Sequence, residues 1–248
     1  MANTEPWDVK TEDSREADGL VTFIIYCEDD NSEPIYFRSL ATERVKINAI
    51  QNQKSGKLNL INAIGDCVRE KRAFFSDNRY QIIEGLQNHI WCVYDRDLES
   101  EQFEEIPNKN NLDFDMAIQT ASNAGLNIAW SNDAFELWIL LHFEDVPLEA
   151  ILHRNYIYER LTEIFKTIEP RSPELDEITN HQHFYYKNSF KRKEYFLKIV
   201  LPTLTQRMPE AIERAKKLEL HFADRGEPFH KRNPCTLVHH LVEKILNS

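Results

Sequence analysis

The chain has little glycine, no long apolar run and no excess of basic residues, and each of these features excludes a class of protein. Only six of the 248 residues are glycine. Neither a GxGxxG nor a GxxxxGKS/T sequence occurs, so a dinucleotide-binding fold or a P-loop ATPase is not expected. No apolar run approaches the roughly 18–20 residues of a transmembrane helix. Residues 1–19 are polar and acidic without the apolar core of a signal peptide, and we expect a disordered lead-in there.

Cysteine is also scarce. The four cysteines, Cys27, Cys67, Cys92 and Cys235, are widely spaced and form no CxxC pair. Three of them lie among apolar residues, which is typical of buried free thiols. We therefore expect a cytoplasmic protein without a disulfide framework.

The net charge of −11 argues against unspecific coating of nucleic acid. The charge is unevenly distributed, because residues 1–150 carry 13 Lys/Arg against 28 Asp/Glu, whereas residues 151–248 carry 17 against 13. An acidic half that could hold metal ions is thus joined to a mildly basic half that could contact phosphates. Ordinary variation of surface charge explains the same distribution, and the sequence does not decide between the two.

Apolar periodicity predicts alternating strands and helices in the first 147 residues. Strands are expected at residues 21–27, 45–50, 89–94 and 127–130. Helices are expected at residues 33–44, 57–75, 112–124 and 133–143. This alternation is typical of an α/β fold with a mostly parallel sheet, in which ligands bind beyond the carboxyl ends of the strands.

Strand signals stop after about residue 147. Helices are expected at residues 151–168, 190–205, 210–220 and 235–246, with prolines in the connections. We therefore expect an α/β domain at residues 20–147 and a helical subdomain at residues 148–248 that packs on it.

Two aspartates, Asp95 and Asp97, end the apolar run WCVYDRD. Asp is depleted in strands, and two carboxylates this close repel each other. If the backbone is extended, positions i and i+2 face the same side, so both side chains would point at one spot. A solvated acidic turn and half of a divalent-metal site both explain this pair.

Other predicted strands end in acids as well. Glu28 follows the first strand, and Glu136 lies just after the fourth in the turn at residues 131–136. Because the carboxyl ends of parallel strands share one edge, these acids and the Asp95/Asp97 pair are expected to converge. Converging carboxylates without basic partners are typical of a site for Mg²⁺, Mn²⁺ or Ca²⁺ and favour the metal site over the solvated turn.

The runs CEDDNSEPIYF, VYDRD, SNDAFELWILLHF and NPCTLVHHLVEKI, together with YYK and AIERAKKL, resemble blocks of the RloB family. They occur in the family's order from about residue 22 to residue 246. The resemblance implies a Toprim-like domain and a role in phage defence by abortive infection. It also implies a partner ATPase of the AAA/ABC type, encoded nearby.

The resemblance further implies an Mg²⁺-dependent (or Mn²⁺-dependent) nuclease that hydrolyses phosphodiester bonds of DNA or RNA. The catalytic residues that it implies are Glu28, Glu33, Asp95, Asp97 and Glu136. These five and Ser131, which belongs to the SN-x-x-FE block, would bind one or two metal ions. Glu28 is also a candidate general base. Candidates for contacts with the nucleic-acid backbone are Lys187, Lys191, Arg192 and Lys193, although a solvated basic face explains the run 191–193 equally.

One residue departs from the family pattern. Asp29 stands where the family usually has glycine, and Ser32 where threonine is common. A negative side chain that faces a phosphate would slow a nuclease. The alternative function is therefore a non-catalytic Toprim-like subunit that binds or senses a ligand within an ATPase complex.

Two histidine pairs, His181/His183 and His239/His240, have no cysteine or third histidine at the spacing of zinc ligands, so zinc is not expected. One ring of the pair His239/His240 is expected to face the core and the other the solvent. The apolar residues of the run at 133–143 are expected to be core: Phe135, Leu137, Trp138, Leu140 and Leu141.

Overall fold

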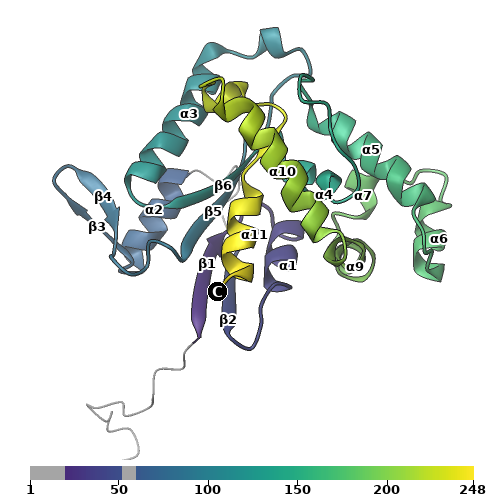
Figure 1. Cartoon of the computed structure of the whole chain (residues 1–248), viewed down its shortest axis with the longest axis horizontal. Helices are drawn as coiled ribbons and strands as arrows, with labels where there is room; N and C mark the ends of the chain where they lie inside the picture. Colours follow the sequence, from purple (N-terminus) through teal and green to yellow (C-terminus); the bar gives the residue numbers. More distant parts are fainter. Residues whose placement is uncertain (1–19, 52–59) are drawn as a thin grey trace, which may run out of the picture.

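A computed structural model describes residues 20–51 and 60–248 of the chain. Its centre is a five-stranded sheet with the strand order β2-β1-β5-β6-β7 (Figure 1). The first four of these strands pair in parallel, and β7 is antiparallel to β6. The strands are β1 (Val21–Tyr26), β2 (Val45–Ile50), β5 (Ile90–Asp95), β6 (Asn127–Asn132) and β7 (Cys235–Thr236). The expected α/β fold with a mostly parallel sheet is confirmed.

Helices cover both faces of the sheet, with α2 and α3 on the side opposite α1 and α4 (Figure 1). The helices are α1 (Ser32–Arg38), α2 (Leu60–Arg69), α3 (Asn108–Asn123), α4 (Glu136–Leu141), α5 (Arg154–Thr167), α6 (Pro173–Thr179), α7 (Tyr186–Ser189), α8 (Lys193–Tyr195), α9 (Leu201–Thr205), α10 (Met208–Ala223) and α11 (Val238–Leu246). Short turns of other helix types lie at η1 (Phe103–Glu105), η2 (Phe196–Val200) and η3 (Phe229–Lys231). None of the helices within the described parts of the chain is long and apolar enough to cross a bilayer.

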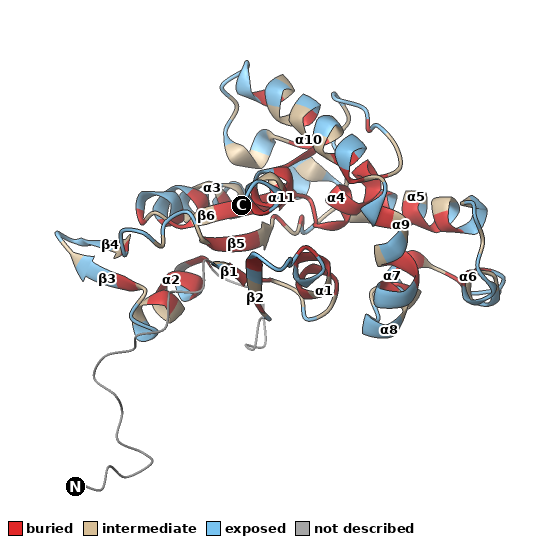
Figure 2. Ribbon diagram, turned by 60° about the horizontal axis from the view of Figure 1, so that its bottom comes forward, coloured by how far each residue is buried: buried red, intermediate tan, exposed pale blue. Residues whose placement is uncertain are grey.

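The strands are apolar on both faces because each face is covered. In β1, Phe23 and Ile25 belong to the core cluster shared with α1 and α4, whereas Ile24 and Tyr26 belong to the cluster shared with α2 and α3. This alternation follows from the two-residue repeat of a strand. Figure 2 shows buried residues along β5 and β6 in the middle of the sheet.

Two helix predictions extend too far. The helix expected at residues 33–44 ends at Arg38, and the Thr42 hydroxyl then accepts hydrogen bonds from the backbone N–H groups of Arg44 and Val45. Such side-chain bonds favour a turn over a helix. The helix expected at residues 57–75 begins outside the described residues, and α2 ends at Arg69.

A hairpin follows α2 that the sequence interpretation did not predict. Strands β3 (Ala73–Ser76) and β4 (Arg79–Ile82) pair in antiparallel fashion. Asp77 and Asn78 connect them, both with positive φ, at 52° and 64°. Two such residues in a two-residue loop match the twist of a hairpin, and Asp and Asn adopt this conformation more readily than most residues.

The C-terminal half is helical except at its end. The helix expected at residues 235–246 is divided, because Cys235 and Thr236 form β7 and the helix α11 begins at Val238. The prediction that strands stop after residue 147 is therefore wrong at this point. Strand β7 pairs with the last residues of β6, so the C-terminus completes the sheet.

One apolar cluster joins residues from both halves of the chain. Phe23 and Phe37 from the N-terminal half belong to the same buried cluster as Phe165, Leu204 and Val242. The boundary expected at residue 147 stays a prediction. All four cysteines are buried and free, as expected.

Candidate functional site

The acids of the sequence prediction gather at the carboxyl edge of the sheet. β1 and β5 are neighbours in the sheet, and the Glu28 Oε2 atom, just beyond β1, accepts a hydrogen bond of 2.8 Å from the backbone N–H of Asp95. The carboxylate of Glu28 thus lies directly beside the end of β5. This convergence arises because parallel strands end at the same edge.

Glu33 and Asp29 hold the loop that carries Glu28. The Glu33 Oε2 atom accepts hydrogen bonds from the backbone N–H groups of Glu28, at 2.6 Å, and Asp29, at 3.3 Å. The Asp29 carboxylate accepts hydrogen bonds from the N–H groups of Asn31, Ser32 and Glu33. Asp29 therefore caps the start of α1, because its oxygens satisfy backbone donors that a helix leaves unpaired at its first turn.

Asp95 carries a buried carboxylate oxygen without a hydrogen-bond partner. Its Oδ2 atom accepts a hydrogen bond of 2.9 Å from the backbone N–H of Phe135, whereas its Oδ1 atom is buried and unpartnered. Burial, followed by repulsion from Glu33 and Glu28, raises the pKa of Asp95 well above its usual value. Burial and the charges of Asp29 and Glu28 likewise raise the pKa of Glu33. A cation would relieve the repulsion among these acids.

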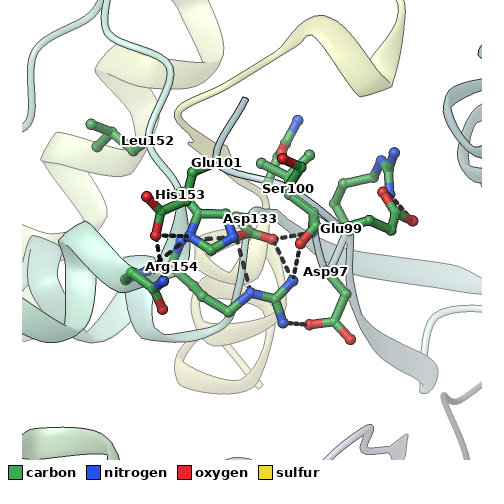
Figure 3. A network of polar contacts seen from close by, with 12 residues as sticks. Asp97, Glu99, Ser100, Glu101, Asp133, Leu152, His153 and Arg154 are labelled. Carbon is green, nitrogen blue, oxygen red and sulfur yellow. Dashed lines mark hydrogen bonds and ion pairs between the residues drawn. The ribbon is translucent and has the colours of Figure 1, made fainter. Parts of the chain in front are cut away.

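Asp97 lies beyond the strand and faces a different partner. β5 ends at Asp95, and Asp97 has a φ of 53°, so the rule that residues i and i+2 of an extended chain face the same side fails here. The Asp97 carboxylate forms an ion pair with Arg154 of α5 (Figure 3). The charge of Asp97 is one of the causes that raise the pKa of Asp95, after burial, Glu33 and Glu28.

Arg154 joins Asp97 to Asp133, a residue with no exposed surface. The Arg154 guanidinium donates two hydrogen bonds of 3.1 Å to the Asp133 carboxylate, one from Nε and one from an Nη. The same carboxylate accepts the backbone N–H groups of Leu98, at 2.6 Å, and Arg154, at 2.8 Å. Figure 3 shows Arg154 between the two aspartates. This network fixes the loop that follows β5.

Glu136 is buried at the start of α4 and pairs with Lys191. Its Oε1 atom lies 2.7 Å from the Lys191 Nζ atom, and the Tyr158 hydroxyl donates a hydrogen bond of 3.5 Å to Oε2. Burial alone would lower the pKa of Lys191, but Glu136, Tyr158 and Asp29 raise it overall. Lys191 is therefore charged and turned toward the acidic edge.

The other predicted residues occupy different surroundings. The Ser131 hydroxyl lies 3.0 Å from the Thr236 hydroxyl of β7, with which it shares a hydrogen bond. Arg192 and Lys193 are exposed beside Lys191, and the Lys187 Nζ atom lies 5.5 Å from the ring centroid of Tyr158. The structure thus brings Lys191 to the acids and leaves Arg192 and Lys193 on the surface.

The donor set fits a hard cation in its chemistry. Glu28, Asp95, Asp97 and Glu136 offer carboxylate oxygens, and the Oδ1 atom of Asp95 lacks a partner. In the described parts of the chain, the acids of the carboxyl edge do not bring three ligand atoms within 4.8 Å of one another. Among the described residues, such a group occurs elsewhere in the fold. Binding of an ion at the carboxyl edge would therefore require rotation of these carboxylates, which for Asp97 and Glu136 means exchange of their basic partners.

Arg154 and Asp133 are the residues of this network that the sequence interpretation did not assign. Asp133 lies in the run SNDAFE, but Arg154 comes from the next helix, 57 residues after Asp97. No spacing rule connects residues so far apart, because the contact depends on how α5 packs. An aspartate within an apolar run, such as Asp133, indicates that a basic partner is needed, but it does not indicate which one.

The fold and the site define an α/β protein whose parallel sheet presents a group of acids at its carboxyl edge. The family model described as RloB-like protein matches residues 23–245. The chain therefore belongs to the RloB-like family. Neither the curated proteins nor the solved structures include a match to it.

Proposed function

We propose that the protein hydrolyses phosphodiester bonds of nucleic acid with Mg²⁺ or Mn²⁺ held at the carboxyl edge of the sheet, as the Toprim-like motifs imply. The observation that carries this proposal is the Oδ1 atom of Asp95, a buried carboxylate oxygen without a hydrogen-bond partner. Leaving such an oxygen unpaired is costly, and a cation would satisfy it. Glu28 lies beside it as a second carboxylate ligand.

Each residue of the edge has a distinct role in this proposal. Glu28 and Asp95 bind the ion, with Asp97 or Glu136 joining them. The ion supplies positive charge that activates water and neutralises the phosphate oxygens. Lys191, whose ammonium group lies 2.7 Å from Glu136, balances the phosphate charge when Glu136 turns to the ion. Glu33 positions Glu28 by accepting a hydrogen bond from the backbone N–H of Glu28.

Asp29 is compatible with this activity. The Asp29 carboxylate accepts three backbone N–H groups at the start of α1, so its oxygens are engaged by the chain itself. These bonds turn the carboxylate toward α1, which reduces the conflict that a negative side chain in place of glycine would create with a phosphate.

The biological setting is proposed on the family resemblance. The chain would act in the cytoplasm in abortive-infection defence, together with an AAA/ABC-type ATPase. Lys187, Arg192 and Lys193 would contact the nucleic-acid backbone, because they lie on the surface near Lys191, which faces the acids.

The test is the variant Asp95→Asn, assayed with labelled DNA and RNA in Mg²⁺ and in Mn²⁺, with and without the ATPase. We expect cleavage by the wild type and at least a ~100-fold loss in the variant, because a metal ligand is lost. In the absence of metal the variant should be more stable by about 1–3 kcal/mol, because it removes a buried charge that Glu33 and Glu28 repel. Urea unfolding measures this difference.

The matched control is Asp30→Asn, since Asp30 is an exposed acid of the same edge. It should cleave like the wild type and keep its stability. If Asp95→Asn retains full activity, or if the wild type cleaves neither nucleic acid with either metal ion, the proposal is wrong.

A second candidate function is a non-catalytic binding subunit. It is favoured by the ion pairs of the edge, because Arg154 neutralises Asp97 and Lys191 neutralises Glu136 within the chain. In that case calorimetry would detect no binding of Mg²⁺, and neutralising Arg192 and Lys193 would weaken nucleic-acid binding without any cleavage to lose.

A further inference from the structure

A second group of chemically active side chains lies away from the carboxyl edge, between α10 and α11. Glu219 of α10 faces His239 and His240 of α11. The Glu219 Oε2 atom lies 3.0 Å from the His239 Nε2 atom and 2.7 Å from the His240 Nε2 atom. The ligand atoms of all three residues lie within 4.8 Å of one another, and this is the one such group among the described residues.

The distances from the Glu219 oxygen to the two histidine nitrogens are close to the ligand spacing that a metal ion requires. Zn²⁺ binds imidazole nitrogen and carboxylate oxygen at about 2.0–2.2 Å, so neighbouring ligand atoms of a tetrahedral site lie about 3.3 Å apart. The two contacts of Glu219 need to open by only a few tenths of an ångström to reach this separation. Both histidines already direct the same ring nitrogen, Nε2, toward the carboxylate.

We propose that Glu219, His239 and His240 form a binding site for a divalent transition metal ion, with Zn²⁺ as the best fit. Two imidazole nitrogens and one carboxylate oxygen suit Zn²⁺, Co²⁺ or Ni²⁺, whereas Mg²⁺ prefers oxygen ligands alone. Three protein ligands leave a fourth position for water or another ligand. The site is separate from the carboxyl edge and does not depend on the proposed nuclease activity.

The two histidines differ in burial, so one can hold the ion firmly and the other lies where an ion can enter. His239 is 1% exposed and fixed in the core, whereas the side chain of His240 is 46% exposed. His240 also lines a cavity of about 440 Å³ together with Trp91 and Trp130. An ion can therefore enter from the side of His240 and bind a ligand that α11 already holds in place.

An ion at this site would tie the C-terminal helix to α10. Helix α11 directly follows β7, whose Thr236 shares a hydrogen bond with Ser131 of β6. The sequence offered no zinc signal here, because the third ligand is a glutamate 20 residues before His239 on another helix.

The experiment uses the full chain without a histidine tag, stripped of metal by a chelator and kept in excess Mg²⁺ so that the carboxyl edge is saturated. Zn²⁺ is titrated by calorimetry, and Co²⁺ by its visible absorption, which reports the coordination geometry. We expect one equivalent of each to bind. His240→Ala and Glu219→Gln should each weaken binding by about tenfold or more, since each removes a ligand. Zn²⁺ should also raise the melting temperature of the wild type more than that of His240→Ala.

Two controls separate this site from other metal-binding groups. The double variant His181→Ala/His183→Ala removes the other histidine pair, which is exposed, and Asp95→Asn alters the carboxyl edge; both should bind Zn²⁺ like the wild type. The proposal is overturned if the wild type binds no stoichiometric Zn²⁺ or if His240→Ala, with its exposed side chain, binds it equally well. The three residues then form only a hydrogen-bonded group.

Discussion

His142 is the residue for which the structure gives the clearest pH dependence. Its ring is 1% exposed, with Nδ1 2.9 Å from the Trp138 carbonyl oxygen and Nε2 buried without a partner. Burial lowers the pKa of His142 from 6.5 to about 4. The folded protein therefore keeps the ring neutral over a pH range in which the unfolded chain protonates it.

We expect His142 to reduce the stability of the protein in mild acid. The folded-state pKa is depressed below the unfolded value, so this contribution is constant above pH 6.5 and is lost as the pH falls toward about 4. The loss approaches ~3 kcal/mol below pH 4 and is about 2 kcal/mol at pH 5, because each pKa unit corresponds to about 1.4 kcal/mol. Urea unfolding at pH 7.5 and pH 5 measures it, and the pH effect should shrink in His142→Gln.

The control for His142→Gln is the replacement of an exposed histidine. His181→Gln should leave the pH effect unchanged, since its side chain lies on the surface. Equal pH effects in the wild type and His142→Gln would contradict the assignment. Subtracting the pH effect of His142→Gln from that of the wild type also removes the contribution of the acids at the carboxyl edge, because both proteins contain them.

Among single residues, the sequence predicted which acids lie together at the carboxyl edge but not their partners. Glu28, Asp95 and Glu136 do lie at one edge of the sheet, because strand order places them there. The pairing of Lys191 with Glu136 and of Arg154 with Asp97 joins positions 55 to 57 residues apart, and nothing in local spacing indicates it. The sequence predicts Lys191 as one of a basic run, yet its side chain pairs with Glu136 whereas Arg192 and Lys193 are exposed.

At the scale of elements, the hairpin β3–β4 shows how short sequence signals decide local structure. Lys71, with a φ of 57°, lies between α2 and this hairpin. The sequence predicts that residues 73–75 continue the helix, since Phe75 falls at a helical spacing. The connection Asp77–Asn78 is a signal that outweighs this spacing, because both residues tolerate positive φ.

Replacing Asn78 by valine should weaken the hairpin. A β-branched residue at a φ of 64° is strained, at a cost of about 1–2 kcal/mol. Asn78→Gly should retain or increase local stability, because glycine adopts positive φ without steric cost. Hydrogen exchange at the amides of Phe74 and Gln81, a hydrogen-bonded pair of the hairpin, measures local opening, which should be faster in Asn78→Val than in Asn78→Gly. Equal exchange in the two variants would contradict the turn assignment.

At the scale of the whole molecule, the C-terminal helix α11 is part of the central core. Leu241 and Val242 have no exposed surface and belong to the same cluster as Phe23 of β1. β7, directly before α11, completes the sheet. The last residues of the chain thus stabilise the edge strand that lies beside the candidate site.

Leu241→Ala should destabilise the entire protein. A buried leucine replaced by alanine costs about 2–5 kcal/mol, through lost apolar burial and the cavity that remains. Leu246→Ala in the same helix is the control, since Leu246 is 54% exposed and its replacement should cost less than about 1 kcal/mol. Thermal unfolding followed by circular dichroism measures both. Similar losses in the two variants would mean that α11 does not pack as described.

The alternation of strands and helices, the parallel sheet and the acids at the strand ends follow from the chain alone, because they depend on local periodicity and on chain order. Which charges meet depends on the packing of the fold. Arg154 reaches Asp97, Lys191 reaches Glu136, and Glu219 joins two histidines through the packing of helices far apart in the chain. Such contacts depend on the orientation of whole helices, which no short stretch of sequence specifies.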